Sequence, residues 1–147
     1  MLKTLTVASI AFASAVFAQD VSPKLSLPEI PKPQHGADSK EKAGVPKGEI
    51  IKLKFSDSKV FPGTKRNINL YLPANYDPKK EAAVMVFQDG HTYVNPKGDF
   101  RIPTVFDNLI ASKEIPPVIG IFIDPGHKGD SVPPSPWKNN NRSFEYD

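Results

Sequence analysis

Cysteine is missing from all 147 residues of the sequence. Its absence excludes disulfide bonds, zinc sites built on thiolates and cysteine nucleophiles together. It also excludes a lipid anchor attached through cysteine. A domain of this kind has to be stabilised by its hydrophobic core alone.

Charge of one sign is not gathered anywhere in the chain. Lysine and arginine number 19 and the acidic residues 16, for a formal net charge of +3, and the lysines are scattered among acids. Nucleic-acid interfaces need a basic patch or stripe, which is not present. A glycine-rich phosphate loop and a dinucleotide fingerprint are also absent. We therefore expect no nucleic-acid partner and no cofactor.

A hydrophobic run long enough to span a membrane is absent as well. Residues 5–17 are apolar, small or hydroxyl-bearing, and they follow a positively charged start at Lys3. The triplet Val16-Phe17-Ala18 then places small residues where a signal peptidase needs them. This layout is typical of a secretory signal peptide. We predict a signal peptide over residues 1–18, a mature chain from Gln19, no membrane span, and export to the periplasm or the extracellular space.

Residues 19–47 have a different composition. Lys, Ser, Glu and Gly are frequent among its prolines, and almost no bulky apolar residue follows Ile30 to offset the entropy of ordering. Prolines occur at 23, 28, 31, 33 and 46. We predict a Pro-rich, disordered linker that separates the export signal from a folded part over residues 48–147.

The folded part begins with two segments of alternating hydrophobicity. Residues 49–55 and 67–72 alternate, and Pro62-Gly63 supplies a turn between them. The pattern predicts an antiparallel hairpin. The side chains expected to face the core are Ile51, Leu53, Phe55, Ile68, Leu70 and Leu72.

A parallel unit follows the hairpin. Residues 83–87 and 118–123 are apolar runs typical of strands buried on both faces. Between them, residues 104–111 have helical spacing, with Pro103 in the first turn. Strand, helix and strand in this order predict a right-handed crossover. We expect an α/β fold, the first part of a doubly wound sheet with one face and at least one edge bare, and an irregular tail from Asp124.

Five local phrases occur in a fixed order. They are N-L-Y-L-P-A-N-Y at 69–76, M-V-F-Q-D-G at 85–90, P-T-V-F-D-N-L-I at 103–110, P-P-V-I-G at 116–120 and N-R-S-F-E-Y-D at 141–147. Together they resemble the putative esterase family of the α/β-hydrolase superfamily, which includes enterochelin esterases, esterase D-like enzymes and feruloyl esterase modules. The resemblance covers only the N-terminal half of the family's domain.

The resemblance implies a serine esterase that works through an acyl-enzyme. The chain itself contains no Gly-x-Ser-x-Gly motif, since Ser131 has Gly129 two residues before it but Pro133 two residues after it. The family order is serine, then acid, then histidine. We therefore expect all three catalytic residues beyond Asp147, and none in this chain.

One catalytic element is implied within the chain. The family's loop after the third strand supplies an oxyanion-hole N–H, and it maps onto Gln88, Asp89, Gly90 and His91. We expect the main chain at Asp89 and Gly90 to act, rather than the imidazole of His91. A glycine at this point allows the backbone to approach a ligand closely.

Three further residues are candidates around that loop. By resemblance, Arg142 and Glu145 order the loop beside the active site, and the alternative is a surface ion pair. Trp137 is a candidate for lining a carbohydrate or aromatic-ester subsite, and the alternative is ordinary packing of its own loop.

A metal site is the remaining chemical alternative. His127, Asp124 and Asp130 cluster in the sequence and could be joined by His91, but their spacing matches no established ligand pattern. We expect no metal.

The sequence leaves three hypotheses for function. The first is the N-terminal part of an exported serine carboxylic-ester hydrolase that acts on a small-molecule or glycan ester when complete. The second is a non-catalytic binding module with an α/β-hydrolase-like fold, for carbohydrate in particular. The third is an incomplete product with exposed apolar surface and no function of its own. The sequence does not define the oligomeric state.

Overall fold

A computed structural model describes residues 31–32, 34–134 and 140–146. The chain divides into two compact units, Met1–Lys32 and Pro33–Asp147. The predicted signal peptide, residues 19–30 and 33 of the predicted linker, and the candidate Trp137 lie outside the described residues. Within the described residues, no helix has both the length and the apolar composition that a membrane crossing requires. All elements below belong to the second unit.

The predicted hairpin is confirmed. Strands β1 (Glu49–Phe55) and β2 (Arg66–Leu72) pair antiparallel along their full length. Between them, Gly63 takes a positive φ of 75°, a conformation that favours glycine, and Thr64 N–H donates to the Phe61 carbonyl at 3.2 Å. Alternating side chains and a local turn determine this hairpin.

The predicted parallel crossover is also confirmed. Strands β3 (Ala83–Gln88) and β4 (Val118–Ile123) pair in parallel, and helix α2 (Ile102–Ala111) connects them with a proline in its first turn. Strand β4 also pairs antiparallel with β2, which gives the order β1-β2-β4-β3. The result is a mixed four-stranded sheet.

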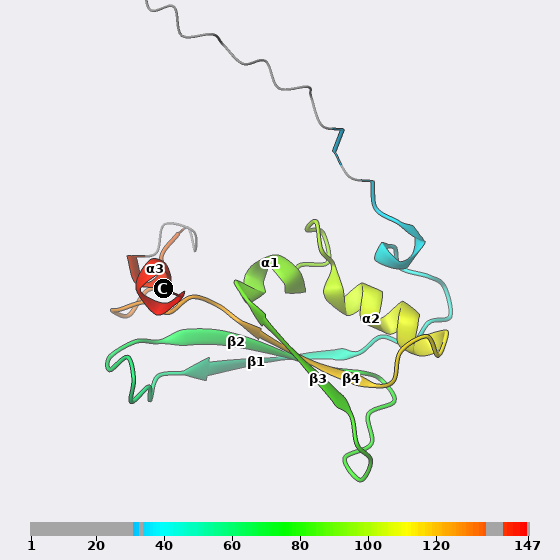
Figure 1. Cartoon of the computed structure of the whole chain (residues 1–147), viewed down its shortest axis with the longest axis horizontal. Coiled ribbons are helices and arrows are strands. Elements are labelled where there is room, and N and C mark those ends of the chain that lie inside the picture. Colours follow the sequence, from blue (N-terminus) through cyan, green and yellow to red (C-terminus); the bar gives the residue numbers. More distant parts are fainter. Residues whose placement is uncertain (1–30, 33, 135–139, 147) are drawn as a thin grey trace, which may run out of the picture. The chain divides into compact units, whose positions relative to one another are not determined.

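The core lies on one face of this sheet. Figure 1 shows helices α1 (Gly90–Val94) and α2 together on that face. Side chains from β2, β3, β4 and α2 meet there, and the rings of Phe87 and Phe122 stack with centroids 4.8 Å apart. We call the four rings Tyr71, Phe87, Phe106 and Phe122 the aromatic centre.

Two predictions about burial are wrong. Strand β3 is not buried on both faces: Val84 is 58% exposed and Val86 is 55% exposed, on the face of the sheet that no described helix covers. The alternating residues Ile68 and Leu70 do not face the helices either, because Tyr71 occupies the helix-covered side of β2. The corresponding apolar row of β1 is partly exposed too, in particular Leu53 and Phe55.

The opposite face accounts for this difference. Among the described residues, no helix packs on the face that carries Val86, Ile121 and Leu70, which share one row across the sheet. The sequence prediction of one bare face agrees with this arrangement. The apolar rows of the hairpin, however, point towards the bare face and not towards the helix-covered core.

Two segments expected to be irregular contain helices. Within the predicted linker, a 3-10 helix η1 (Ala37–Ser39) packs on α2, and the Asn108 amide donates to the carbonyls of Asp38 and Lys40 at 2.8 Å each. In the tail, residues Asn140–Tyr146 form helix α3. Residues 38–40 are therefore held on α2 by hydrogen bonds. The tail is not irregular throughout.

Candidate functional site

The sequence-predicted loop is a direct junction between β3 and α1. Gln88 is the last strand residue, Asp89 is the N-cap with φ 55° and ψ 43°, and Gly90 is the first helical residue. A Cβ atom at Gly90 would overlap the backbone of Phe122 and Ile123 on β4. Only glycine fits there, because a strand backbone cannot move aside as a flexible side chain can.

The main-chain N–H groups of this junction differ in whether they already donate a hydrogen bond. The Thr92 N–H donates to the Asp89 carbonyl at 2.9 Å, and the His91 N–H donates to Asp124 Oδ1 at 2.7 Å. No atom of the described residues accepts a hydrogen bond from the Gly90 N–H. Among the predicted oxyanion donors, the His91 N–H is thus already engaged and the Gly90 N–H is available to a ligand.

The carboxylate of Asp89 is held from helix α3. Arg142 donates from Nε to Asp89 Oδ1 at 2.8 Å and from Nη2 to Oδ2 at 2.6 Å. Two parallel, charge-assisted hydrogen bonds fix both the position and the plane of a carboxylate. Asp89 has a left-handed backbone conformation that non-glycine residues rarely adopt, and this contact holds it in place.

The same helix holds the ends of two other strands. Glu145, with a side chain 2% exposed, accepts a hydrogen bond at 2.8 Å from the Gly126 N–H just after β4. Its other oxygen lies 3.2 Å from an Nη atom of Arg66, the first residue of β2. We call Asp89, Gly126, Arg142, Glu145 and Arg66 the polar edge.

The alternative of a surface ion pair between Arg142 and Glu145 does not match this geometry. Each side chain binds a different partner, and Glu145 is buried. The glycine at 126 is required by this packing, since a Cβ atom there would meet the side chains of Glu145 and Thr64. Helix α3 therefore connects the ends of β2, β3 and β4.

The cluster considered for metal binding separates in the structure. His91 Nδ1 lies 3.3 Å from Asp124 Oδ1, but Asp130 pairs with Lys65 at 2.8 Å on the surface. His127 is 6% exposed, and its backbone exchanges two hydrogen bonds with that of Lys65. Among residues 31–32, 34–134 and 140–146, no three acidic or histidine side chains converge on a common metal position.

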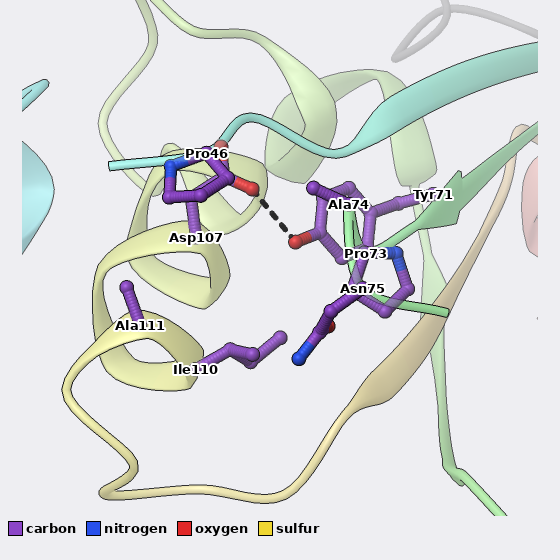
Figure 2. Close-up of a pocket in the computed structure, with 8 residues that line it drawn as sticks. All are labelled: Pro46, Tyr71, Pro73, Ala74, Asn75, Asp107, Ile110 and Ala111. Carbon is purple, nitrogen blue, oxygen red and sulfur yellow. Dashed lines mark hydrogen bonds between the residues drawn. The ribbon is translucent and has the colours of Figure 1, made fainter. Parts of the chain in front are cut away.

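A small cavity of about 70 Å³ lies away from this junction, between α2, the end of β2 and the segment before β1 (Figure 2). In Figure 2 the Tyr71 hydroxyl points to Asp107, to which it donates a hydrogen bond at 2.8 Å. Asp107 also accepts from the Gly48 N–H at 2.8 Å. Burial of Tyr71, and its hydrogen bond to the Asp107 carboxylate, raise the pKa of Tyr71 far above its usual value. This cavity is lined by Pro46, Pro73 and Ile110 among others, and it has no second charged side chain with which to bind a ligand.

Sequence reasoning identified the junction but missed several of its partners. Asp124 and Arg66 are the acceptor and the cation that complete the network, and neither was expected in these roles. For Asp124, the sequence did contain a signal, since a polar residue directly follows an apolar run typical of a buried strand. Nothing in the local sequence distinguishes Arg66 from other strand residues.

Comparison with known proteins gives one family match. The family model described as "Putative esterase" matches residues 58–146, which is more than half of the chain. The matched region contains β2, β3, β4 and all of α1, α2 and α3. The comparison with curated proteins gave no match.

Several solved structures are similar to the chain. A CE1 ferulic acid esterase of the anaerobic fungus Anaeromyces mucronatus, without substrate, is 24% identical with a TM-score of 0.54. The match covers 74% of this chain and 41% of the fungal one. The same enzyme in complex with ferulic acid is 22% identical with a TM-score of 0.52, over 74% and 40%.

A feruloyl esterase module of Clostridium thermocellum, complexed with sinapinate, is 20% identical with a TM-score of 0.48, over 61% of this chain and 31% of that one. At these identities, the two fungal matches show a shared fold only. The chain spans about two fifths of the length of the fungal esterase.

Proposed function

The chain belongs to the putative esterase family, and we propose that it is the N-terminal part of a serine carboxylic-ester hydrolase. The resemblance identified in the sequence is confirmed by the family match, and its α/β-hydrolase fold by the fungal structures. The nucleophilic serine, its acid and its histidine are proposed to lie beyond Asp147. The reacting ester is then a small-molecule or glycan ester.

The proposed reaction has two acyl transfers. The serine oxygen bonds to the acyl carbon while the bond from that carbon to the alcohol oxygen breaks, and the histidine carries the serine proton to the leaving alcohol. Water then attacks the acyl-enzyme, and its proton returns through the histidine to the serine. Each transfer passes through an oxyanion that needs hydrogen-bond donors in fixed positions.

The role proposed for this chain is to supply one of those donors. The Gly90 N–H is the observation that carries the proposal, since it follows a strand end, is fixed by close packing against β4 and has no acceptor within the described residues. Preorganised backbone donors stabilise an oxyanion because they need no rearrangement during the reaction.

Arg142 and Glu145 are proposed to be positioning residues for this donor. Arg142 holds the carboxylate of Asp89, the residue just before Gly90, and Glu145 anchors the same helix to β4 and β2. Neither side chain needs to touch the substrate to act in this way. Loss of either should change the placement of the donor rather than the chemistry of the nucleophile.

Export is a further part of the proposal. The charged start, the apolar residues 5–17 and the small residues before Gln19 support a cleaved signal peptide and a periplasmic or extracellular enzyme. N-terminal sequencing of the secreted protein tests this, with Gln19 expected as the first residue. An uncleaved Met1 on the mature protein would contradict it.

The test of the catalytic proposal begins with the DNA beyond the codon for Asp147. We expect the reading frame to continue into a strand followed by Gly-x-Ser-x-Gly, and then an acid and a histidine. The complete protein should be labelled by a fluorophosphonate at that serine, and should hydrolyse p-nitrophenyl acetate and methyl ferulate. Replacement of the serine by alanine is the control and should abolish both the labelling and the hydrolysis.

A stop codon directly after Asp147 in the native gene would overturn the proposal. So would a complete protein that no fluorophosphonate labels. In either case, the binding-module hypothesis would be the one to pursue, with glycan binding as its first assay.

A further inference from the structure

Asp124 connects the end of strand β4 with the candidate site. It directly follows Ile123, the last residue of β4, and its backbone N–H donates to the Asn67 carbonyl of β2 at 3.0 Å. This hydrogen bond continues the antiparallel pairing of β4 with β2 by one residue. The carboxylate of Asp124 binds α1, where its Oδ1 accepts the His91 N–H at 2.7 Å. The backbone of Asp124 is therefore fixed by the sheet, and its side chain holds the helix.

The same carboxylate oxygen also lies close to the His91 ring. His91 Nδ1 is 3.3 Å from Asp124 Oδ1, and the side chains of His91 and Asp124 are 25% and 18% exposed. A hydrogen bond from a backbone N–H to a carboxylate is charge-assisted, and it is stronger than one between neutral groups. Partial burial strengthens it further, because the local dielectric constant is lower than that of water. Asp124 therefore contacts both the backbone and the ring of His91.

Gly90 lies between two residues that are held from outside the junction. Arg142 binds the carboxylate of Asp89 on one side, and Asp124 binds the N–H of His91 on the other. Close packing against β4 requires glycine at position 90, but glycine also has the widest range of backbone conformations of any residue. The direction of its N–H therefore depends on its two neighbours, one held from α3 and the other from the end of β4.

The contact at Asp124 needs an acceptor oxygen and does not need a charge. The side-chain oxygen of an asparagine at this position can accept the same N–H. An alanine has no acceptor, so the His91 N–H would lose its partner in a partly buried place. Asparagine and alanine variants therefore separate the effect of the hydrogen bond from the effect of the charge.

We propose that Asp124 is a further positioning residue for the oxyanion donor at Gly90. Arg142 acts through the residue before Gly90, and Asp124 acts through the residue after it. Asp124 does not need to touch the substrate in this role. Its contact with His91 stands on the structure, whereas its effect on catalysis rests on the proposed function.

The first measurement is hydrogen exchange at the His91 amide of the complete protein, which needs no catalytic turnover. Asp124→Ala should speed this exchange about tenfold, since the hydrogen bond of the amide is lost. Asp124→Asn should keep the exchange rate within about twofold of wild type, because its side-chain oxygen accepts the same hydrogen bond. An unchanged rate in Asp124→Ala would show that Asp124 does not hold His91, and would overturn the proposal.

Asp77 offers a matched control. Its Oδ1 accepts the Lys79 N–H at 3.0 Å in the turn before β3, at the opposite end of that strand from the junction. Asp77→Ala therefore also removes a carboxylate that accepts a main-chain N–H. It should leave the exchange at His91 and the kcat unchanged. Equal effects of Asp77→Ala and Asp124→Ala would overturn the proposal.

The second measurement is the kinetics of the complete protein on methyl ferulate, with active sites counted by complete fluorophosphonate labelling. Asp124→Ala should lower kcat about tenfold and change KM less than about twofold, since a misplaced donor weakens the binding of the transition state alone. Asp124→Asn should restore kcat to within about twofold of wild type. Equal losses of kcat in the two variants would overturn a role through the hydrogen bond.

An inhibitor separates positioning from a general loss of structure. A trifluoromethyl ketone forms an oxyanion adduct with the serine, so its affinity for Asp124→Ala should fall by the same factor as kcat/KM. A merely structural defect would lower the number of active sites and leave the affinity of the remaining sites unchanged. That result would overturn the positioning role.

The two proposals can fail separately. If Asp124→Ala speeds exchange at His91 but no serine of the complete protein is labelled, the catalytic proposal is wrong and only the contact between Asp124 and His91 stands. If the serine is labelled and Asp124→Ala keeps the full kcat, the esterase stands and the positioning role of Asp124 is wrong.

Discussion

The aromatic centre and the polar edge are built in different ways. In the aromatic centre, Tyr71 and Phe122 are almost completely removed from water, and their contribution depends on buried area. At the polar edge, Asp89, Arg142 and Glu145 are joined by charged hydrogen bonds with defined directions. Burial of apolar area is not directional, whereas such hydrogen bonds fix orientation. We infer that the aromatic centre determines whether the sheet is stable, and that the polar edge determines where the junction backbone lies.

The largest difference in the free energy of unfolding is expected between alanine variants of two phenylalanines, one in the aromatic centre and one on the helix that carries the polar edge. Phe122→Ala in the aromatic centre should lower the free energy of unfolding by about 3–5 kcal/mol, because Phe122 is fully buried. Phe144→Ala on α3 should cost less than about 1 kcal/mol, since Phe144 is 74% exposed and touches only the edge of the Phe61 ring among the described rings. Urea denaturation of both variants measures the difference. Similar losses would show that the two regions are not distinct in stability.

The second prediction concerns the glycine where the two regions meet. Gly90→Ala should cost about 1–3 kcal/mol, because the new methyl group overlaps the backbone of Phe122 and Ile123. Gly36→Ala is the matched control: nothing lies near its Cβ position and its φ of −66° suits alanine, so no loss of stability is expected. In the complete protein, Gly90→Ala should also lower the rate of acyl-enzyme formation. Full activity at normal stability would exclude this backbone as a donor.

The third prediction separates position from stability at the polar edge. Arg142→Lys keeps the charge but loses the two-point contact with Asp89, and should cost about 1–2 kcal/mol at most, since Arg142 is partly exposed. The kcat of the complete protein should fall about tenfold with KM little changed, because only the placement of the donor is altered. Arg101→Lys is the control, as Arg101 binds the carbonyls of Gly98 and Ser39 away from the junction. Equal effects on kcat would contradict the assignment.

The smallest effect is expected for a hydroxyl group in the aromatic centre. Tyr71→Phe keeps the ring and removes the hydrogen bond to Asp107, which still accepts from Gly48, so the loss should be about 0.5–1.5 kcal/mol. The pH dependence of this loss of stability is a more specific test of the environment of Tyr71. The pKa of Tyr71 is raised in the folded state, whereas the unfolded tyrosine ionises near pH 10.

The sign of this dependence follows from the proton count. Above about pH 10 the unfolded state loses a proton that the folded state keeps, so the stability contributed below that pH is lost as the pH rises. The difference in stability between wild type and Tyr71→Phe should therefore shrink above pH 10, by up to about 1.4 kcal/mol per pH unit. A constant difference from pH 8 to 11 would show that Tyr71 ionises normally in the folded protein.

The strands, their pairing and the crossover helix could be predicted because the signals are local. Alternation and proline positions determine which residues share a face and where elements end, as with Pro103 at the start of α2. They do not tell which face the helices cover. Leu70 and Tyr71 are both apolar enough for a core, and only packing against α2 places Tyr71 inside. The same reason explains why β3 was expected to be buried on both faces, since the sequence of a strand does not tell whether a helix covers each of its faces.

The site could be predicted only in part, because its contacts join distant residues. The junction at Asp89 and Gly90 follows from the strand end and from the family resemblance. Arg142 reaches Asp89 across 53 residues of sequence, and helix α3, which presents it, has no periodic pattern that predicts it. The buried His127 was considered as a metal ligand, whereas its backbone pairs with that of Lys65. Lys65 directly precedes β2, which the local sequence does not connect to His127.

The position of β3 has a consequence for how the chain behaves in solution. No strand among the described residues pairs with the outer side of β3, so its N–H and C=O groups on that side form a ready template for another strand. Natural sheets block such templates with lysine, proline or a bulge, and Val84-Met85-Val86 has none of these. Wherever this side is left open, neighbouring molecules can extend the sheet and self-associate. Concentration-dependent aggregation, suppressed by Met85→Lys, would be its signature.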